Sequence, residues 1–301
     1  MLTTRMMAPS FALRPFVWSY GHTQGVISGQ PLRVPLPARP KQVLMFFFQD
    51  RYDVHRHDTA GHGTGHGTGH GTGHGTGHGT GHGETSPRSM VAGPQTFYRL
   101  DLAILGIVDV FTIHFQPAGF HHLFGTPMCE LTDASYDADG VIGVHSTVLR
   151  QRLSSVSTFE ERILIAEKYL LRRVRARGDL DQVAREANRL FASNGTCTVA
   201  RMAARVELTE RQLERRFLAQ VGVSPKLYSR VVRFSAALDR KLNSPGTSWT
   251  DIAHDFCYYD QMHMVHDFRD LAGDSPTRFL GRINEVPQFQ TAFRAANRPN
   301  T

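Results

Sequence analysis

One pattern of residues, which predicts a pair of short helices, occurs twice in the second half of the chain. Residues 200–225 read ARMAARVELTERQLERRFLAQVGVSP, and residues 250–276 read TDIAHDFCYYDQMHMVHDFRDLAGDSP. In the first copy Leu213 and Phe217 are four residues apart, which places both side chains on one face of a helix. A glycine and a Ser-Pro pair follow, and they predict the end of that helix and the capped start of the next. The second copy has the same pattern 51 residues later, so the chain contains an internal repeat.

Each copy is expected to fold as a helix-turn-helix unit. A short helix is predicted over 200–206 in the first copy and over 250–256 in the second, and a link of about three residues follows each. A helix, a short turn and a second helix form the arrangement that places the second helix in the major groove of DNA. We therefore expect recognition helices over about 209–221 and 260–272.

The positive charge of the chain lies in the half that holds the repeat. Residues 1–150 contain 10 Lys and Arg against 10 Asp and Glu, whereas residues 151–301 contain 24 against 17, which accounts for the net charge of +7. A neutral half joined to a basic half suggests a sensing domain joined to a domain that binds a polyanion. A basic surface without a nucleic-acid partner is the alternative that charge alone leaves open.

The first recognition helix has a strongly polar face. Leu213 is surrounded there by Glu210, Arg211, Gln212, Glu214, Arg215 and Arg216. Arg can pair with guanine, Gln with adenine and Glu with cytosine in the major groove. Thr209 is expected to cap this helix, and phosphates are expected to meet the helix N-terminus, Lys226, Arg230 and Arg233. A solvated charged helix is the alternative, and the duplication of the whole pattern favours DNA binding.

Short motifs follow one another along this half of the chain. They are Met202-Ala203, Leu213-Glu-Arg215-Arg-Phe217, Gly222-Val-Ser-Pro225, Arg233-Phe234-x-x-Ala237, Ile252-Ala253, Tyr258-Tyr-Asp260-Gln261 and Phe268-Arg-x-x-x-Gly273-x-Ser-Pro276. Together they resemble the AraC/XylS family of bacterial regulators, over about residues 180–282. The resemblance implies two helix-turn-helix subdomains joined by a long helix over 224–242, with recognition helices in adjacent major grooves. By family position, it implies that the base-reading residues are Arg211, Glu214, Arg215, Gln261, Met262 and His266.

The second copy departs from the family pattern. Cys257 stands where a glycine is usual, Met264 where Phe is usual and His266 where Arg is usual. Residues 196–241 contain 10 Lys and Arg against 4 Asp and Glu, whereas residues 247–282 contain 3 against 6. Because phosphate contacts supply much of the affinity for DNA, we expect the first unit to anchor the complex and the second to add less.

The first half of the chain is expected to be rich in β-strands. Residues 43–48 predict a short buried strand, and residues 102–115, which are interrupted by Gly106, predict a hairpin or two strands. Dense proline and glycine over 31–40 predict loops and edges. This region loosely resembles the regulatory domains that precede the family's DNA-binding module. The predicted fold is therefore α+β, with a cupin-like barrel or sandwich followed by an all-α domain with two helix-turn-helix subdomains.

The predicted layout has four parts. Residues 1–150 form a β-rich regulatory or effector domain, 151–178 a linker or dimerisation helix, 179–285 the DNA-binding domain and 286–301 a flexible tail. Within the linker, Ser157 or Thr158 is expected to cap a helix that Gly178 ends, and a further helix is predicted over 180–191.

A low-complexity tract interrupts the first half. Gly-His-Gly-Thr repeats over 61–84 include six histidines four residues apart, and this composition predicts disorder. Such histidines bind nickel, copper or zinc weakly. The pairs His55/His57 and His121/His122 are candidate ligands of a second, structured metal site. No carboxylate follows His57 at the spacing that a cupin metal site needs. We therefore predict neither a metal nor another cofactor, and a metal-binding cupin-type enzyme or a histidine-rich metal-sensing protein with a DNA-binding tail remain the alternatives.

The partners follow from this interpretation. We predict a cytoplasmic, non-enzymatic regulator of transcription initiation that binds double-stranded promoter DNA, RNA polymerase, a small-molecule effector and a second copy of itself. The chain has no apolar run of about 20 residues and no signal-peptide pattern, so no membrane partner is expected. Its three cysteines are far apart, which fits a reducing compartment. No nucleophile elbow, phosphate loop or pair of catalytic carboxylates is recognisable.

Overall fold

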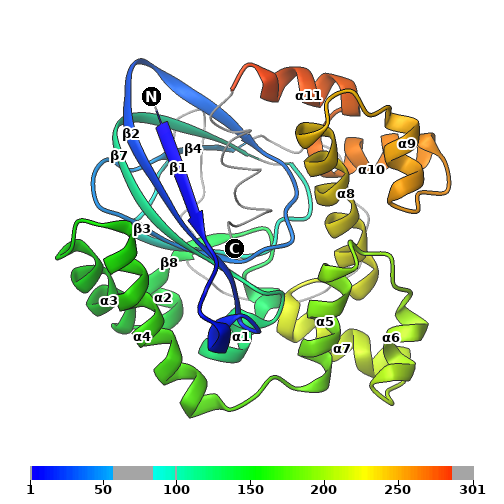
Figure 1. Ribbon diagram of the computed structural model, residues 1–301, viewed down its shortest axis with the longest axis horizontal. Coiled ribbons are helices and arrows are strands. Elements are labelled where there is room, and N and C mark those ends of the chain that lie inside the picture. Colours follow the sequence, from blue (N-terminus) through cyan, green and yellow to red (C-terminus); the bar gives the residue numbers. More distant parts are fainter. Residues whose placement is uncertain (1, 57–83, 99, 287–301) are drawn as a thin grey trace.

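The structure is a computed structural model that describes residues 2–56, 84–98 and 100–286. A curved antiparallel sheet occupies one side of the molecule, helices α2–α4 lie beneath it, and helices α5–α11 flank it on the right in Figure 1. The predicted α+β class is confirmed, because strands fill the first half and helices the second. The repeat tract over 61–83, His57 and residues 287–301 lie outside the described residues, and so do the predictions made for them.

The sheet of the described part has the order β1-β2-β7-β3-β6-β8, and all its pairs are antiparallel. A short additional ribbon forms where β4 pairs with β5 and with the first residues of β7. The strands are β1 (Leu2–Met7), β2 (Val17–Leu36), β3 (Val43–Phe47), β4 (Asp53–Arg56), β5 (Glu84–Thr85), β6 (Ser89–Ala92), β7 (Leu100–Phe115) and β8 (Ser135–Asp137).

The strand predicted over 43–48 is confirmed as β3, whereas the prediction for 102–115 is wrong. That segment is one long strand, β7, which pairs with β2 from one end to the other. Gly106 has φ +87°, and the register of β2 shifts opposite it, between Ile27 and Leu32. A glycine in this conformation bends a strand without ending it, because it has no Cβ to clash.

The proline-rich segment over 31–40 was expected to form loops and edges, yet Pro31 and Pro35 lie inside β2. Strand β1 pairs with β2 only from Tyr20 to Gly25. Beyond that point β7 is the neighbour that pairs with β2 in the described part of the sheet. A proline is tolerated there because a strand needs no backbone N–H on a side without a partner.

Three short helices between the sheet and the linker were not predicted. They are α1 (Gly119–Phe124), α2 (Ala138–Ile142) and α3 (His145–Ser154). Turns of 3-10 helix lie at Phe11–Leu13, between β1 and β2, and at Met128–Glu130, between α1 and β8. The predicted linker helix is confirmed as α4 (Phe159–Arg177). Thr158 and Glu161 form a capping box at its start, and Gly178 with φ +75° ends it.

An ion cluster fastens α4 to the sheet. Arg162 is buried and donates to both carboxylate oxygens of Asp109 on β7, at 2.6 and 3.0 Å. His22 of β2 lies 2.8 Å from Asp109, and Arg162 stacks over Phe48 with its guanidinium carbon 4.0 Å from the ring centroid. Burial raises the pKa of Asp109, but hydrogen bonds from His22 and Arg162 outweigh it and hold that pKa well below its usual range.

The second half is helical throughout its described part. It contains α5 (Gln182–Ala192), α6 (Val199–Arg205), α7 (Glu210–Val221), α8 (Pro225–Asn243), α9 (Trp249–Asp255), α10 (Gln261–Ala272) and α11 (Pro276–Asn284). Helix α5 starts two residues later than predicted because Asp181 caps it. Both helix-turn-helix units are present where the repeat predicted them, and the long connecting helix that the resemblance implied is present as α8.

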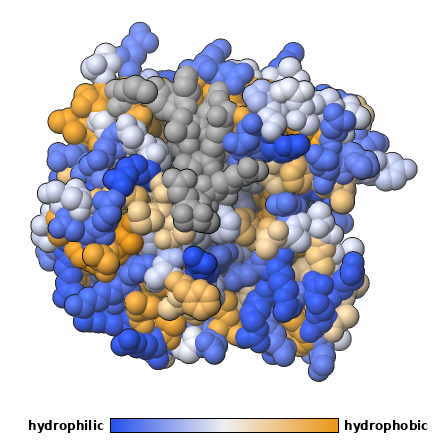
Figure 2. Space-filling view, in the orientation of Figure 1, coloured by the Kyte–Doolittle hydropathy of each residue, from blue (hydrophilic) through white to orange (hydrophobic). Residues whose placement is uncertain are grey.

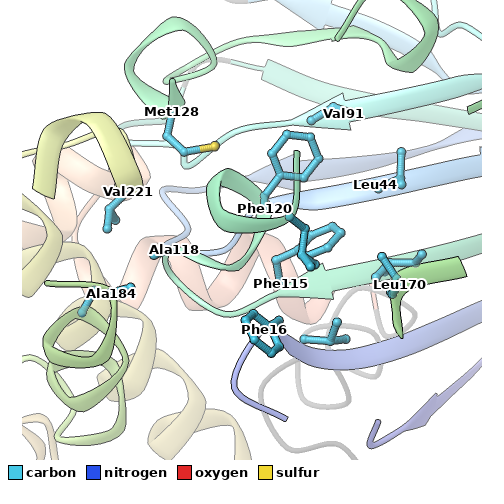
Figure 3. Close-up of a cluster of buried hydrophobic side chains, with 14 of the residues drawn as sticks. Phe16, Leu44, Val91, Phe115, Ala118, Phe120, Met128, Leu170, Ala184 and Val221 are labelled. Atoms are coloured by element: carbon cyan, nitrogen blue, oxygen red, sulfur yellow. The ribbon is translucent and has the colours of Figure 1, made fainter. Parts of the chain in front are cut away.

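The two halves share their hydrophobic cores. One cluster of buried side chains runs from the sheet through α4 into the first unit, and Figure 3 shows Phe120 and Met128 in the same cluster as Ala184 and Val221. The other cluster joins the opposite end of the sheet to α8 and the second unit, and it includes Phe47 and Phe268. Each helix-turn-helix unit is therefore packed against the N-terminal half.

Candidate nucleic-acid interface

The turns of the two units have the same backbone conformation. Glu207 has φ +53° and Cys257 has φ +54°, and each follows directly on the end of the first helix of its unit. A non-glycine residue in this left-handed region is uncommon, because its Cβ crowds the backbone. The turn of the second unit nevertheless keeps the shape that a glycine would give it.

The second turn is one residue longer than the first. Glu207 and Cys257 are 50 residues apart, whereas the caps of the recognition helices, Thr209 and Asp260, are 51 residues apart. The additional residue lies between Cys257 and Asp260, and Tyr259 there is 92% exposed. The repeat is therefore in register on the recognition helices but not across the turns.

The first recognition helix, α7, is set by its cap and its core residues. Thr209 Oγ1 accepts from the backbone N–H of Gln212, whose side-chain oxygen accepts from Thr209 N at 3.0 Å. Leu213 and Phe217 are fully buried. The side chains that the resemblance assigns to base reading are all exposed: Arg211, Glu214 and Arg215.

The second recognition helix, α10, is built in the same way with different side chains. Asp260 caps it by accepting from the N–H of His263 at 2.7 Å. Met264 and Phe268 are fully buried in the positions of Leu213 and Phe217. The side chains expected to read bases are again exposed: Gln261, Met262 and His266. Hydrophilic residues cover much of this side of the molecule in Figure 2.

The residues expected to contact phosphate fall into two groups. Thr209 and Lys226 are exposed, at the starts of α7 and α8. Arg230 and Arg233 instead face the second unit from α8. Arg230 lies 2.7 Å from Asp267 and 2.8 Å from Asp270, so its guanidinium is already paired within the chain.

Asp267 is the residue of this region that sequence reasoning missed. Its side chain is 1% exposed and lies between Arg230 and Arg233. Arg233 is 3.8 Å from this carboxylate and stacks over Tyr258 at 4.7 Å from the ring centroid. An acid at the position that Arg216 occupies in the first unit was the available signal, since such a reversal of charge within a repeat indicates a specific partner.

A cavity in the N-terminal half is a second candidate site. It contains about 1210 Å³ of empty space including its mouth, and its walls are mostly apolar side chains of β1, β2 and β7. The basic side chains that line it are Arg39, Lys41 and His114, and its lining residues include no Asp or Glu. Ser235 of α8 also reaches it, so the cavity borders the C-terminal half. The sequence predicted a ligand site in this domain but identified no residue of it.

Burial shifts the titration of all three bases. It lowers the pKa of Lys41 to about 7, against which the charge of Asp239 acts, and lowers that of Arg39 to about 10. The pKa of His114 falls to about 3 because of burial and the nearby charges of Lys41 and Arg39. Arg39 Nε is buried with no hydrogen-bond partner among the described residues. The cavity thus presents cationic and neutral groups to a ligand.

His121 and His122, which were considered as metal ligands, lie close to backbone carbonyl groups instead. His121 Nδ1 lies 2.8 Å from the carbonyl oxygen of Thr126, and His122 Nε2 lies 2.9 Å from that of Gly178. Within residues 2–56, 84–98 and 100–286, no three His, Cys, Asp or Glu side chains come together in a way that could hold a metal ion.

Comparison with known families decides the class of the protein. Residues 202–282, which span both units, match the family model described as a helix-turn-helix domain. The chain is a DNA-binding transcription regulator with an AraC-type helix-turn-helix domain. Residues 5–137 match a domain of unknown function, DUF6597, and no curated protein matches the chain. The alternative of a cupin-type enzyme finds no support in these matches.

Among solved structures, the chain is similar to several of ToxT from Vibrio cholerae. ToxT from Vibrio cholerae O395 has a TM-score of 0.45 and 9% identity, with 95% of this chain and 98% of that chain covered. ToxT bound to (E)-4-(8-methylnaphthalen-1-yl)but-3-enoic acid has a TM-score of 0.45 and 10% identity, with 93% and 98% covered. Unsaturated fatty acid-bound ToxT from strain SCE256 has a TM-score of 0.42 and 9% identity, with 95% and 96% covered.

None of the helices in the described part of this chain combines the length and the apolar character that a membrane span requires.

Proposed function

We propose that the chain is a regulator of the AraC/XylS family whose helices α7 and α10 enter the major groove at a promoter, with α7 providing the stronger contacts. The observation that carries this proposal is that both helices bury their apolar pair and expose the opposite face. Arg211, Glu214 and Arg215 would read bases from α7, and Gln261, Met262 and His266 from α10. The larger positive charge of the first unit favours it as the anchor.

The residues considered for phosphate contacts lie at the starts of α7 and α8 and further along α8. Thr209 and Lys226 are exposed and free to approach the backbone of a duplex. Arg230 and Arg233 would reach phosphate only by leaving Asp267 and Asp270. We assign the first pair to binding and the second to holding α10 against α8 in the absence of DNA.

Selection of genomic DNA fragments by the purified full-length chain tests this function. We expect a specific site with two half-sites in adjacent major grooves, and an affinity that falls steeply as salt rises, because binding releases counterions from phosphate. Recovery of no enriched sequence at low ionic strength would overturn the proposal. A binding constant that does not depend on salt would also contradict it.

The cavity of the N-terminal half is proposed as the effector site. Its apolar walls fit an apolar body, and the basic lining by Arg39 and Lys41 fits an anionic end. Thermal-shift titrations with dodecanoate, dodecanol and dodecylammonium separate the sign of the ligand charge from its apolar bulk. We expect dodecanoate to raise the melting temperature most, and a larger shift with dodecylammonium would contradict an anionic effector.

A second copy of the chain is proposed to pair through α3 and α4. Val148 of α3 and Leu164 of α4 are 46% and 67% exposed, so two helices that pack against each other both offer apolar surface to a partner. We further propose that the bound regulator acts on RNA polymerase at the promoter, in the bacterial cytoplasm. Sedimentation of the wild type and of Leu164→Glu, with and without DNA, tests the pairing, since a monomeric wild type would exclude it.

A further inference from the structure

The recognition helices place different chemistry at equivalent positions. With the offset of 51 residues, Gln261 corresponds to Glu210, Met262 to Arg211 and His266 to Arg215. All of these side chains are exposed, on helices that are capped in the same way and bury an apolar pair at equivalent positions. The second unit therefore presents an amide and a thioether where the first presents an acid and a guanidinium.

Exposed apolar surface gathers at the start of α10. Met262 is 55% exposed and Tyr259, just before the cap Asp260, is 92% exposed. The acidic balance of residues 247–282 makes this end poorly suited to phosphate. A base edge is the surface of a duplex that an apolar side chain can contact, and the C5-methyl group of thymine is the apolar group that unmodified DNA offers in the major groove.

The amide of Gln261 is oriented by a neighbour. Its Oε1 accepts a hydrogen bond from Thr250 Oγ1 on α9, at 2.9 Å. Oε1 thus has one of its two lone pairs engaged by Thr250, whereas Nε2, for which the described residues provide no acceptor, can only donate to a ligand. A bidentate contact to adenine uses both atoms of the amide, whereas the O4 atom of thymine needs one donor.

We infer that the second unit recognises thymine, with Met262 against the C5-methyl group and Gln261 Nε2 donating to O4. The inference rests on the proposed function, because it requires α10 to lie in the major groove. Thymine is the base that offers both a methyl group and an acceptor on this edge, and these are the two contacts that the start of α10 can make.

Deoxyuridine provides the test, since it lacks only the C5-methyl group. In the half-site bound by α10, each thymine of the selected site is replaced singly by deoxyuridine, and affinity for the full-length chain is measured by fluorescence anisotropy. We expect one such position to lose about fourfold in affinity, the value of one buried methyl-sized group. Met262→Ala should abolish the difference between thymine and deoxyuridine there, and Met262→Leu should keep it.

Gln261→Glu tests the other contact. A carboxylate accepts instead of donating, so this variant should lose affinity at the thymine and gain at a site with cytosine in its place. Arg211→Ala is the matched control on α7, because it should weaken binding without changing the ratio of thymine to deoxyuridine in the second half-site. Circular dichroism of each variant checks that α10 remains folded.

The results distinguish a failure of thymine recognition from a failure of the proposed DNA-binding function. If the wild type selects no site, the proposed function fails. If it selects a site but tolerates deoxyuridine at every position of the second half-site, or if Met262→Ala keeps the wild-type ratio, the function stands and the recognition of thymine is wrong.

Discussion

One exposed position of the recognition helices is an arginine in α7 and a histidine in α10, and this difference leads to the first prediction. Arg215 on α7 and His266 on α10 occupy equivalent exposed positions. Arg215→Ala should weaken DNA binding by about 1–3 kcal/mol, roughly 5- to 150-fold, because a guanidinium makes charged contacts in the groove. His266→Ala should weaken it less.

Gel-shift titration of both variants at one salt concentration checks this order. Arg175→Ala, which removes an exposed arginine from α4, serves as a control for the general loss of charge. Equal losses for Arg215→Ala and His266→Ala would contradict the anchoring role of the first unit.

Asp267 gives a prediction about stability. It is 1% exposed and pairs with Arg230 and Arg233, so Asp267→Ala would leave two guanidinium groups facing a carboxylate-sized gap. Because Arg230 is partly solvated, we expect a loss of about 1–3 kcal/mol in the free energy of unfolding. Asp270→Ala is the matched control, and since Asp270 is 54% exposed its loss should stay within about 0.5 kcal/mol. Denaturant titrations in which both variants behaved alike would show that Asp267 does not hold α10.

Lys41 makes stability depend on pH in a defined direction. Burial lowers its pKa to about 7 in the folded chain, whereas an unfolded lysine has its ordinary pKa near 10.5. Between these values the unfolded chain binds more protons, so stability rises with pH at up to about 1.4 kcal/mol per unit. Below pH 7 both states are protonated and this dependence vanishes.

Lys41→Met should remove that contribution, so the difference in unfolding free energy between wild type and variant should change from pH 7 to pH 10. Urea titrations at several pH values measure it. A constant difference over this interval would mean that Lys41 is not neutralised by folding.

At the scale of elements, the two turns store strain at equivalent residues. Glu207 and Cys257 have positive φ angles of 53° and 54°, although neither is glycine. Cys257→Gly should therefore stabilise the chain by about 0.5–1 kcal/mol, and Glu207→Gly should have a similar effect in the first unit. Thermal unfolding measures both. A lower melting temperature for Cys257→Gly would show that the thiol makes contacts that outweigh the backbone gain.

Elements also explain which local predictions succeeded. The caps Thr158, Thr209 and Ser224 and the terminating glycines Gly178 and Gly222 act within a few residues of the helix ends, so sequence alone located those ends. The prediction divided β7 into two strands because a glycine such as Gly106 usually interrupts a strand. The strand is continuous because it pairs with β2, which lies about 75 residues away in sequence. Short helices such as α2 depend on the surface that they cover, which no local pattern contains.

At the scale of the whole molecule, the N-terminal half holds the ends of both recognition helices. The Ala38 N–H donates to the carbonyl oxygen of Leu271 in α10 at 2.8 Å, and Thr132 Oγ1 donates to that of Gly222, after α7, at 2.6 Å. Tyr98 accepts from Arg282 of α11 at 2.6 Å. The relative placement of α7 and α10 is thus set partly by residues outside the DNA-binding region.

This sharing predicts one unfolding event. Because both hydrophobic clusters contain side chains from the two halves, calorimetry of the full chain should show a single transition. Gly222→Ala should lower its midpoint, since the added Cβ would lie 2.8 Å from the carbonyl oxygen of Met128 at a residue with φ +100°. Two well-separated calorimetric transitions would contradict a shared core.

By itself the sequence determined the repeat, the helix ends and the exposed faces of α7 and α10, because these depend on residues only a few positions apart. Tertiary structure alone decided that Arg230 and Arg233 pair with Asp267, that Arg39 and Lys41 line a cavity, and that the sheet supports both recognition helices. Such contacts join segments tens to hundreds of residues apart. Their geometry exists only once the chain has folded. Folding then brings those charged groups together and removes the water that had solvated and screened them.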